Sequence, residues 1–269
     1  MAAIRFSSFT FMRKQGVRLT PGCQFSHKML MIKKGGKTLK KSYLDFLAEF
    51  GIGGAHPGGF SLTKEIFSSI DLPEGAKVLE VGCGTGQSAE YLATVFHCTV
   101  TAIDSHPTML EKAAERLSPL NVEVKYGEAE QLEFPDGTFD FILAESVIAF
   151  TSPLQQTIAE MARVLKKEGT LLVIEMTAEK PLSGEQEQEV KDLYGVTEVL
   201  TEDEWITSFQ RAGFRSCRLL DNMVFEEALT ELRLSENISE ELYDIWDAHE
   251  AFMSRPDTPL SYRVFYCRK

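Results

Sequence analysis

The stretch VLEVGCGTGQ, residues 78–87, decides the fold of this chain. Its apolar start is typical of a buried strand, and glycines follow at positions 82, 84 and 86, just before a helical pattern. A dinucleotide-binding fingerprint would require glycine or alanine at Gln87, and no G-K-[ST] triplet marks a phosphate-binding P-loop. The loop therefore predicts close approach to a ligand that presents no phosphate there.

Strand-like and helix-like segments alternate around this loop. Short apolar runs are typical of strands at 77–81, 98–104, 122–126, 139–144 and 170–176, and helical patterns lie between them at 88–96, 107–117 and 152–165. This alternation predicts parallel strands joined by crossover helices, hence a doubly wound α/β domain. The later segments are a helix with a Thr201–Glu204 capping box, strands at 214–220 and 261–267, and a mostly helical insertion over 221–260.

Asp104 ends the strand predicted at 98–104, eighteen residues after Gly86. An acid at this place is suited to accept hydrogen bonds from the hydroxyls of a ribose. A nucleoside without phosphates satisfies both this acid and the loop that lacks phosphate-binding motifs.

Four segments carry a family resemblance: VLEVGCGTG, VTAIDSHPTML, GEAEQLEFPDGTFDFILA and EMARVLKKEGTLLVIE. In order and spacing they resemble the class I S-adenosylmethionine-dependent methyltransferases of the small-molecule type, over about residues 70–176. The resemblance implies S-adenosylmethionine as cofactor and a mostly parallel seven-stranded sheet whose last strand is antiparallel. It also implies a helical N-terminal cover at 38–70, a cofactor-binding core at 71–176 and a C-terminal part at 177–269. A catalytically silent protein that binds S-adenosylmethionine is the alternative.

The resemblance further implies which residues hold the cofactor. Gly82, Gly84 and Gly86 would shape the bed for its methionine and ribose parts. Glu80 would lie under that loop, at the amino end of the ligand, and Asp104 would take the ribose hydroxyls.

The adenine and the sulfonium would lie against later segments. Ser105 or His106 would border the adenine, and Glu128 stands where the family commonly has an aspartate near the adenine amino group. Ala129 would offer its backbone N–H. Glu145 would face the sulfonium as a binding and candidate catalytic residue, unless it is an ordinary surface side chain.

The segment GIGGAHPGGF, residues 51–60, is half glycine and precedes the first strand. Segments at this place in the family commonly cover the cofactor. We expect its glycines to let it fold over the sulfonium, with His56 facing the substrate as a candidate catalytic residue that accepts or orients a proton. The alternative is an inert connector with a solvated histidine.

Charge restricts the partners. The 269-residue chain carries 28 basic and 40 acidic side chains, and residues 1–44 hold ten of the basic ones and no acid. An acidic body repels polyanions, so we expect a small-molecule acceptor and no nucleic acid; no membrane span is expected because no run of eighteen apolar residues occurs. Four aromatic residues either line a pocket for a cationic or planar acceptor or pack in the core: Tyr194, Trp205, Tyr243 and Trp246.

The N-terminal residues 1–37 are predicted to be a basic extension with little order. We expect a cytoplasmic protein, or a mitochondrial one if residues 1–28 are a transit peptide; an upstream extension before Met29 or Met31 is the alternative. Five scattered cysteines without a C-x-x-C pair argue against a disulfide framework and a zinc site, so no metal is expected. The sequence leaves the oligomeric state open.

Overall fold

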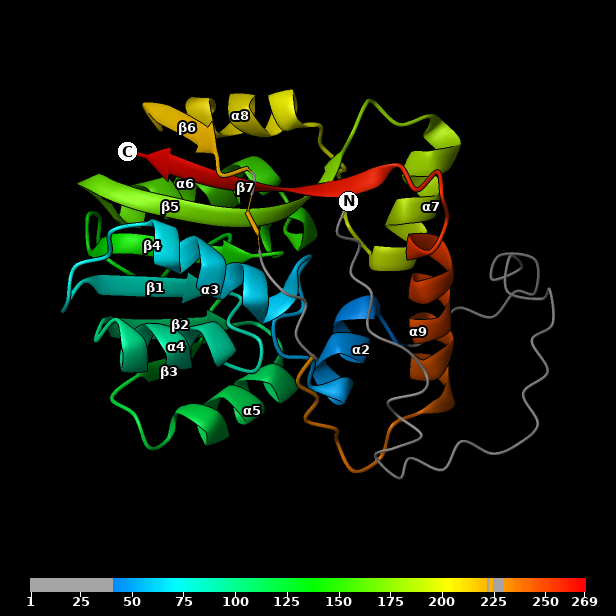
Figure 1. The fold of residues 1–269 in the computed structure, drawn as a ribbon, viewed down its shortest axis with the longest axis horizontal. Helices are drawn as coiled ribbons and strands as arrows, with labels where there is room; N and C mark the ends of the chain where they lie inside the picture. The colour runs from blue at the N-terminus through cyan, green and yellow to red at the C-terminus, as the bar shows by residue number, and fades with distance from the viewer. Residues whose placement is uncertain (1–40, 222, 225–229) are drawn as a thin grey trace.

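The computed structural model describes residues 41–221, 223–224 and 230–269. Within them, seven strands form one sheet in the order β3-β2-β1-β4-β5-β7-β6 (Figure 1). Their bounds are β1 Lys77–Val81, β2 Thr99–Asp104, β3 Glu123–Tyr126, β4 Phe139–Glu145, β5 Leu165–Ala178, β6 Ser216–Leu219 and β7 Leu260–Arg268. β1 pairs in parallel with β2 and β4, whereas β7 is antiparallel to β5 and β6. The predicted doubly wound sheet is confirmed. The predicted extension at 1–37, with its transit-peptide alternative, lies outside the described residues.

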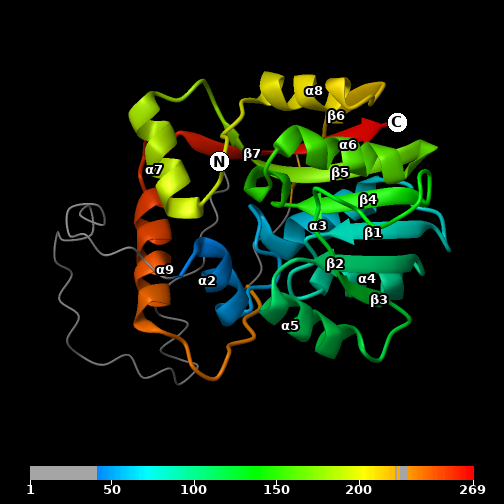
Figure 2. The ribbon, with the colours of Figure 1, turned by 180° about the vertical axis from the view of Figure 1, so that it is seen from behind.

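Helices cover both faces of the sheet (Figures 1 and 2). Their bounds are α2 Tyr43–Phe50, α3 Gly59–Ser69, α4 Gln87–Val95, α5 Pro107–Leu117, α6 Leu154–Val164, α7 Gly184–Tyr194, α8 Glu202–Arg211 and α9 Glu240–Met253, with a 3₁₀ turn η2 at Ile148–Phe150. One apolar cluster joins the sheet to α3, α4 and α5 through residues such as Ile66 and Leu92. A second cluster joins the opposite face to α6 and α8, for example through Ile158 and Phe209.

Three further helices, α2, α7 and α9, stand together beyond the carboxyl ends of the parallel strands (Figures 1 and 2). Phe50 of α2 packs against Tyr243 and Trp246 of α9, with ring centroids 5.2 and 5.1 Å apart. Trp205 of α8 is buried against Phe209. Three of the four aromatic residues considered for an acceptor pocket therefore serve packing. No helix among the described residues is both long and apolar enough to cross a bilayer.

Helix α3 begins two residues before Ser61, although serine is a residue type that commonly caps helices. The helix begins at Gly59, and Gly58 is its N-cap with φ 81°. Only glycine adopts such a left-handed backbone at little cost, so two glycines in a row start the helix earlier than its side chains suggest. The Thr201 capping box is confirmed, because the Thr201 backbone N–H donates to Glu204 at 2.8 Å.

Two cysteines correct the prediction that the chain has no disulfide framework. Cys217 of β6 and Cys267 of β7 are register partners and form a disulfide across a sequence separation of 50 residues. The spacing of the cysteines along the chain does not reveal this pair, because only the antiparallel register of the last two strands brings the two residues together. Cys83 and Cys98 are buried free thiols.

Candidate active site

A pocket of about 250 Å³ opens at the carboxyl ends of β1, β2 and β4. This is the point where the winding of the sheet reverses, and where open α/β sheets hold their ligands. The pocket is lined by nine of the ten predicted site residues: His56, Glu80, Gly82, Gly84, Asp104, Ser105, Glu128, Ala129 and Glu145.

Gly86 is the predicted residue that does not line the pocket. It is the N-cap of α4 with φ 77°, and a Cβ atom there would lie 2.9 Å from Cδ1 of Leu117. Its missing side chain lets α5 approach the start of α4 closely.

The other two glycines form the pocket floor. Gly82 has φ 69°, and a Cβ atom there would lie 2.4 Å from a methyl carbon of Val147. The Gly84 backbone N–H donates to one carboxylate oxygen of Asp104 at 2.8 Å, and the His106 N–H donates to the other at 2.8 Å. Burial raises the pKa of Asp104, while these two donors act in the opposite direction. The loop and the acid at the end of β2 thus fix one another.

Glu80 lies beneath the loop and is 4% exposed. Its Oε2 atom has no hydrogen-bond partner among the described residues. Burial raises the pKa of this carboxyl well above its ordinary value, and the negative charges of Glu145 and Asp104 raise it further. An unpaired buried carboxyl oxygen is costly unless it is protonated or meets a cation, so Glu80 is a candidate to hold a positive group of a ligand.

Glu145 joins three segments that are distant in sequence. Its Oε1 accepts a hydrogen bond from the Thr63 hydroxyl of α3 at 2.6 Å, and its Oε2 accepts one from the Ser88 hydroxyl of α4 at 2.6 Å. His56 Nε2 lies 3.0 Å from Thr63 Oγ1 and 3.3 Å from Glu145 Oε1. The His56 side chain is 2% exposed and that of Glu145 is 8% exposed, so neither is solvated surface.

One hydroxyl connects His56 to Glu145. His56 Nδ1 lies 3.1 Å from the Pro57 carbonyl oxygen, which only accepts, so Nδ1 carries a proton. The Thr63 hydroxyl has a single proton, which it can donate either to Glu145 or to His56 Nε2. The cluster therefore provides a hydrogen-bonded path between His56 and Glu145.

The end of the pocket beside Glu128 is less enclosed. Glu128, which replaces the aspartate common in the resembled family, accepts a hydrogen bond from the exposed Tyr126 hydroxyl. Ala129 beside it is buried, whereas Ser105 is exposed at the pocket edge.

Hydrogen bonds join the glycine-rich segment to residues 231–233 of the insertion, and the sequence did not predict them. We call these contacts, together with those of the Glu231 side chain, the clamp. The Gly53 N–H donates to the Glu231 carbonyl oxygen at 3.0 Å, and the Arg233 N–H donates to the Gly51 carbonyl oxygen at 3.0 Å. The Glu231 side chain accepts from Gln87 and from Arg116 of α5. The glycine-rich segment is thus tied both to the insertion and to the helix that follows the glycine loop.

We expect Arg116→Ala to weaken this clamp. The Arg116 side chain is 5% exposed and also donates to the Thr85 carbonyl oxygen and to Glu90. The variant should bind S-adenosylhomocysteine about 10-fold more weakly and melt roughly 5 °C lower, because a buried guanidinium with three partners is lost. Titration calorimetry and thermal melting measure both values. Arg215→Ala, which removes an exposed pair with Glu168, is the control and should change neither; equal effects would contradict the clamp.

A second cavity of about 50 Å³ adjoins the first. The two cavities share four lining residues: Leu47, Ala55, Ser146 and Phe150. The second cavity is also lined by Glu175 of β5, Tyr194 of α7 and Met253 of α9. Five of its thirteen lining residues come from α2, α7 and α9, the helices that stand beyond the sheet, and two come from the start of β7.

Several of these residues were not predicted from the sequence: Thr63, Ser88, Arg116, Glu175 and Glu231. Thr63 and Ser88 meet Glu145 across 82 and 57 residues, and no local pattern marks such contacts. Glu175 did leave a signal, because an acid inside the apolar run TLLVIEM stands out from its neighbours. Among the described residues, no group of three His, Cys, Asp or Glu side chains is arranged to hold a metal ion.

Comparison with known sequences gives matches to methyltransferases. Residues 79–173 match the family model of a methyltransferase domain. An uncharacterized methyltransferase of Bacillus subtilis, YodH, is 34% identical over 233 residues, which cover 84% of this chain and 99% of that protein. Phosphoethanolamine N-methyltransferase 3 of Arabidopsis thaliana is 34% identical over 126 residues, covering 46% of this chain and 26% of that protein.

Solved structures share the fold at low sequence identity. Phosphoethanolamine N-methyltransferase 2 of Haemonchus contortus, in complex with S-adenosyl-L-methionine, aligns with a TM-score of 0.66 and 18% identity over 84% of this chain and 56% of that one. The [4+2]-cyclase SpnF aligns with a TM-score of 0.62 and 22% identity over 82% of this chain and 87% of that one. A cyclase and a methyltransferase on one fold mean that the acceptor chemistry has to be argued from the site.

Proposed function

Because this chain belongs to the class I S-adenosylmethionine-dependent methyltransferases, we propose that it methylates a small-molecule acceptor held in the second cavity. The observation that carries this proposal is the continuity of the two cavities, which share Ser146, directly after Glu145, and Phe150. A donor in the first cavity and a small acceptor in the second would meet at this junction. The acidic body, with 18 basic against 40 acidic side chains after residue 44, gives no support to a nucleic-acid acceptor.

The residues of the first cavity fit S-adenosylmethionine, which is the cofactor of this family. Glu80 offers an unpaired buried oxygen to the ammonium of its methionine part, and we propose that Asp104 takes the ribose hydroxyls. We assign the floor to Gly82 and Gly84, and the adenine edge to Ser105, Glu128 and the Ala129 N–H.

S-adenosylmethionine supplies a methyl group on a positively charged sulfur, which is electrophilic without further activation. The residues of the chain therefore have to align the acceptor and exclude water, and alignment alone can contribute about 7–11 kcal/mol. We propose that Glu145 and His56, with Thr63 between them, hold the proton that the acceptor gives up. We further propose that residues 38–70 act as the cover, 71–176 as the cofactor core and 177–269 as the part that builds the acceptor cavity.

The test incubates the full chain with S-adenosylmethionine and a panel of small amines, alcohols, thiols and carboxylates. We expect S-adenosylhomocysteine and one class of methylated product, detected by mass spectrometry. Asp104→Ala should lose most of this turnover, and the exposed Glu74→Gln should keep it. Tight binding of S-adenosylhomocysteine without product from any acceptor would contradict the proposal and identify a catalytically silent binding protein.

A further inference from the structure

The second cavity has a chemical character of its own, which rests on Glu175. This side chain has no exposed surface and lines the cavity from the end of β5. Its Oε1 accepts hydrogen bonds from the backbone N–H groups of Val147 and Ile148, at 2.9 and 2.6 Å. Its Oε2 has no partner among the described residues. A buried carboxyl oxygen left in this state is a position for a hydrogen-bond donor or a cation.

Aromatic rings line the same cavity as this carboxyl. Tyr43 stacks on Phe150 with centroids 6.3 Å apart, and it meets Tyr194 edge-on at 4.9 Å. His249 lies 5.6 Å from Tyr43 and within 3.0 Å of the Tyr194 hydroxyl. All four residues line the second cavity. Ring faces attract cations, and a cage of rings is the common recognition device for methylated ammonium groups.

The cavity presents no positive charge of its own near neutral pH. Its described lining holds neither lysine nor arginine. Burial lowers the pKa of His249 to about 4, so this ring is neutral at pH 7. Burial also raises the pKa of both Tyr43 and Tyr194, so their phenols keep their protons. Glu175 is therefore the one group in the described lining that can carry charge there.

We propose that the acceptor is a small amine that enters as an ammonium ion, paired with Glu175 and held against the rings of Tyr43 and Tyr194. This rests on the proposed function, because it assumes that the second cavity holds the methyl acceptor. Anionic acceptors do not fit the described lining, since a phosphate or carboxylate would meet Glu175 without a compensating cation.

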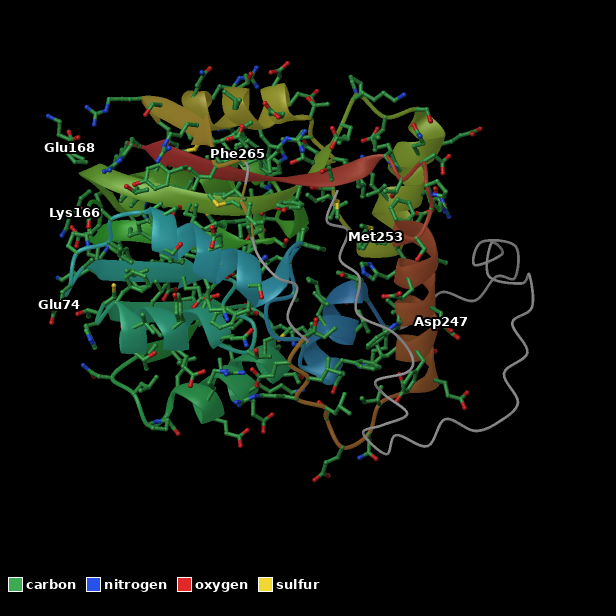
Figure 3. The ribbon with its side chains drawn as sticks, in the orientation of Figure 1. Glu74, Lys166, Glu168, Asp247, Met253 and Phe265 are labelled. Carbon is green, nitrogen blue, oxygen red and sulfur yellow. A yellow bond between two sulfur atoms is a disulfide. The ribbon has the colours of Figure 1, made fainter. Side chains whose placement is uncertain are left out.

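The size of the cavity limits the acceptor as well. About 50 Å³ accommodates a few water-sized groups, which suits a compact ammonium head. Met253, at the end of α9, faces this cavity, whereas Asp247 on the same helix points outward (Figure 3). A longer acceptor would have to place only its amine end here.

The protons and electrons of the proposed methyl transfer balance. The ammonium nitrogen gives one proton to Glu145 and His56, the proton acceptors of the proposed function, and becomes a neutral amine that donates a hydrogen bond to Glu175. Its lone pair then forms the bond to the methyl carbon as the carbon–sulfur bond breaks, and that electron pair stays on sulfur, which becomes a neutral thioether.

Three matched probes test the charge preference apart from catalysis. The full chain, saturated with S-adenosylhomocysteine, is titrated at pH 7.5 with isopropylammonium, its neutral counterpart isopropanol, and the anion isobutyrate. We expect isopropylammonium to bind at least about 10-fold more tightly than isopropanol and isobutyrate to bind most weakly. Tighter binding of either other probe, or no binding of isopropylammonium, would overturn the proposal.

Two sets of variants test which residues give the cavity its preference for an ammonium ion over an alcohol. Glu175→Gln keeps an oxygen for the Val147 and Ile148 N–H groups but removes the charge, so it should bind the ammonium and the alcohol equally. Tyr194→Phe should keep the preference and Tyr194→Leu should reduce it several-fold, which provides a second arm if Glu175→Gln does not fold. Glu74→Gln is the control for charge far from the site (Figure 3). An ammonium preference that survives in both Glu175→Gln and Tyr194→Leu would overturn the proposal.

Turnover separates this inference from the proposed function. Methylation of amines in the panel supports both. Methylation of carboxylates or alcohols alone would overturn the amine inference and leave the small-molecule methyltransferase intact. Ammonium binding that depends on Glu175, without any product, would overturn the proposed transfer and leave the ammonium site intact.

Discussion

His56→Ala is expected to lower kcat by about 100-fold or more, while the affinity for S-adenosylhomocysteine changes by less than about threefold. The histidine lies 3.0 Å from the Thr63 hydroxyl, which also bonds Glu145, so its loss removes one end of a path for a proton. Loss of a positioned proton acceptor typically costs 10²–10⁴ in rate. Steady-state kinetics with the best acceptor of the panel, together with calorimetry, measure the two quantities.

Further variants show whether the cluster works as a unit. Thr63→Val and Glu145→Gln should each lower kcat substantially, and His56→Ala combined with Glu145→Gln should cost little more than either alone, because both remove the same function. His97→Asn changes an exposed histidine with φ 53°, a conformation that asparagine tolerates, and serves as the control. Unchanged kcat in His56→Ala would leave this histidine a purely structural residue of the cover.

Glu80→Gln is expected to weaken S-adenosylmethionine binding by about 10- to 100-fold and to stabilise the protein without cofactor. The carboxylate would make a charge-assisted bond to the cofactor ammonium, and bonds to charged groups contribute roughly 1.5–3 kcal/mol. Without cofactor, Glu80 is buried beside Glu145 and Asp104, whose charges raise its pKa. Glutamine removes that repulsion, so affinity and stability should move in opposite directions. A variant that loses both would show that Glu80 chiefly supports the loop.

The contribution of Glu80 to the stability of the protein depends on pH in a definite direction. Because burial raises the pKa of Glu80 in the folded chain, its contribution to stability is fully present below the ordinary glutamate pKa and is lost as pH rises toward the raised value. Melting temperatures of the wild-type protein should therefore fall relative to Glu80→Gln as pH increases. At a pH between the ordinary glutamate pKa and the raised one, binding of S-adenosylhomocysteine should release a proton, seen as a dependence of the binding enthalpy on the buffer. Equal buffer dependence in Glu80→Gln would assign the proton to another group.

Local signals in the sequence were sufficient for most of the sheet. Strand β1 was predicted at 77–81 and is observed at Lys77–Val81, and helix α5 was predicted at 107–117 and observed at Pro107–Leu117. Apolar runs, a proline at the first helical turn and glycines after the strand are all encoded within a few neighbours. Where conformation depends on glycine backbone freedom, as at Gly58, the side-chain pattern does not mark the start of the helix.

The residues of the candidate site also fall into two groups, those that local sequence signals predict and those that they do not. Residues within the glycine loop and at the strand ends could be placed, because the topology of a parallel sheet brings these ends to one edge. The partners of Glu145 could not be placed, since Thr63 and Ser88 reach it from two helices. The clamp through Arg116 and Glu231 likewise joins residues 115 positions apart.

The division between sheet and outer helices has a consequence for how such enzymes diversify. In the proposed assignment the donor is received by loops that follow the strands, whereas most lining residues of the second cavity come from α2, α7, α9 and the first residues of β7. Exchange of α7 and α9 between homologous proteins should therefore redirect the enzyme to new acceptors without rebuilding its nucleoside half. Selection can thus change the part of the molecule that holds the acceptor while the part that holds the nucleoside stays unchanged.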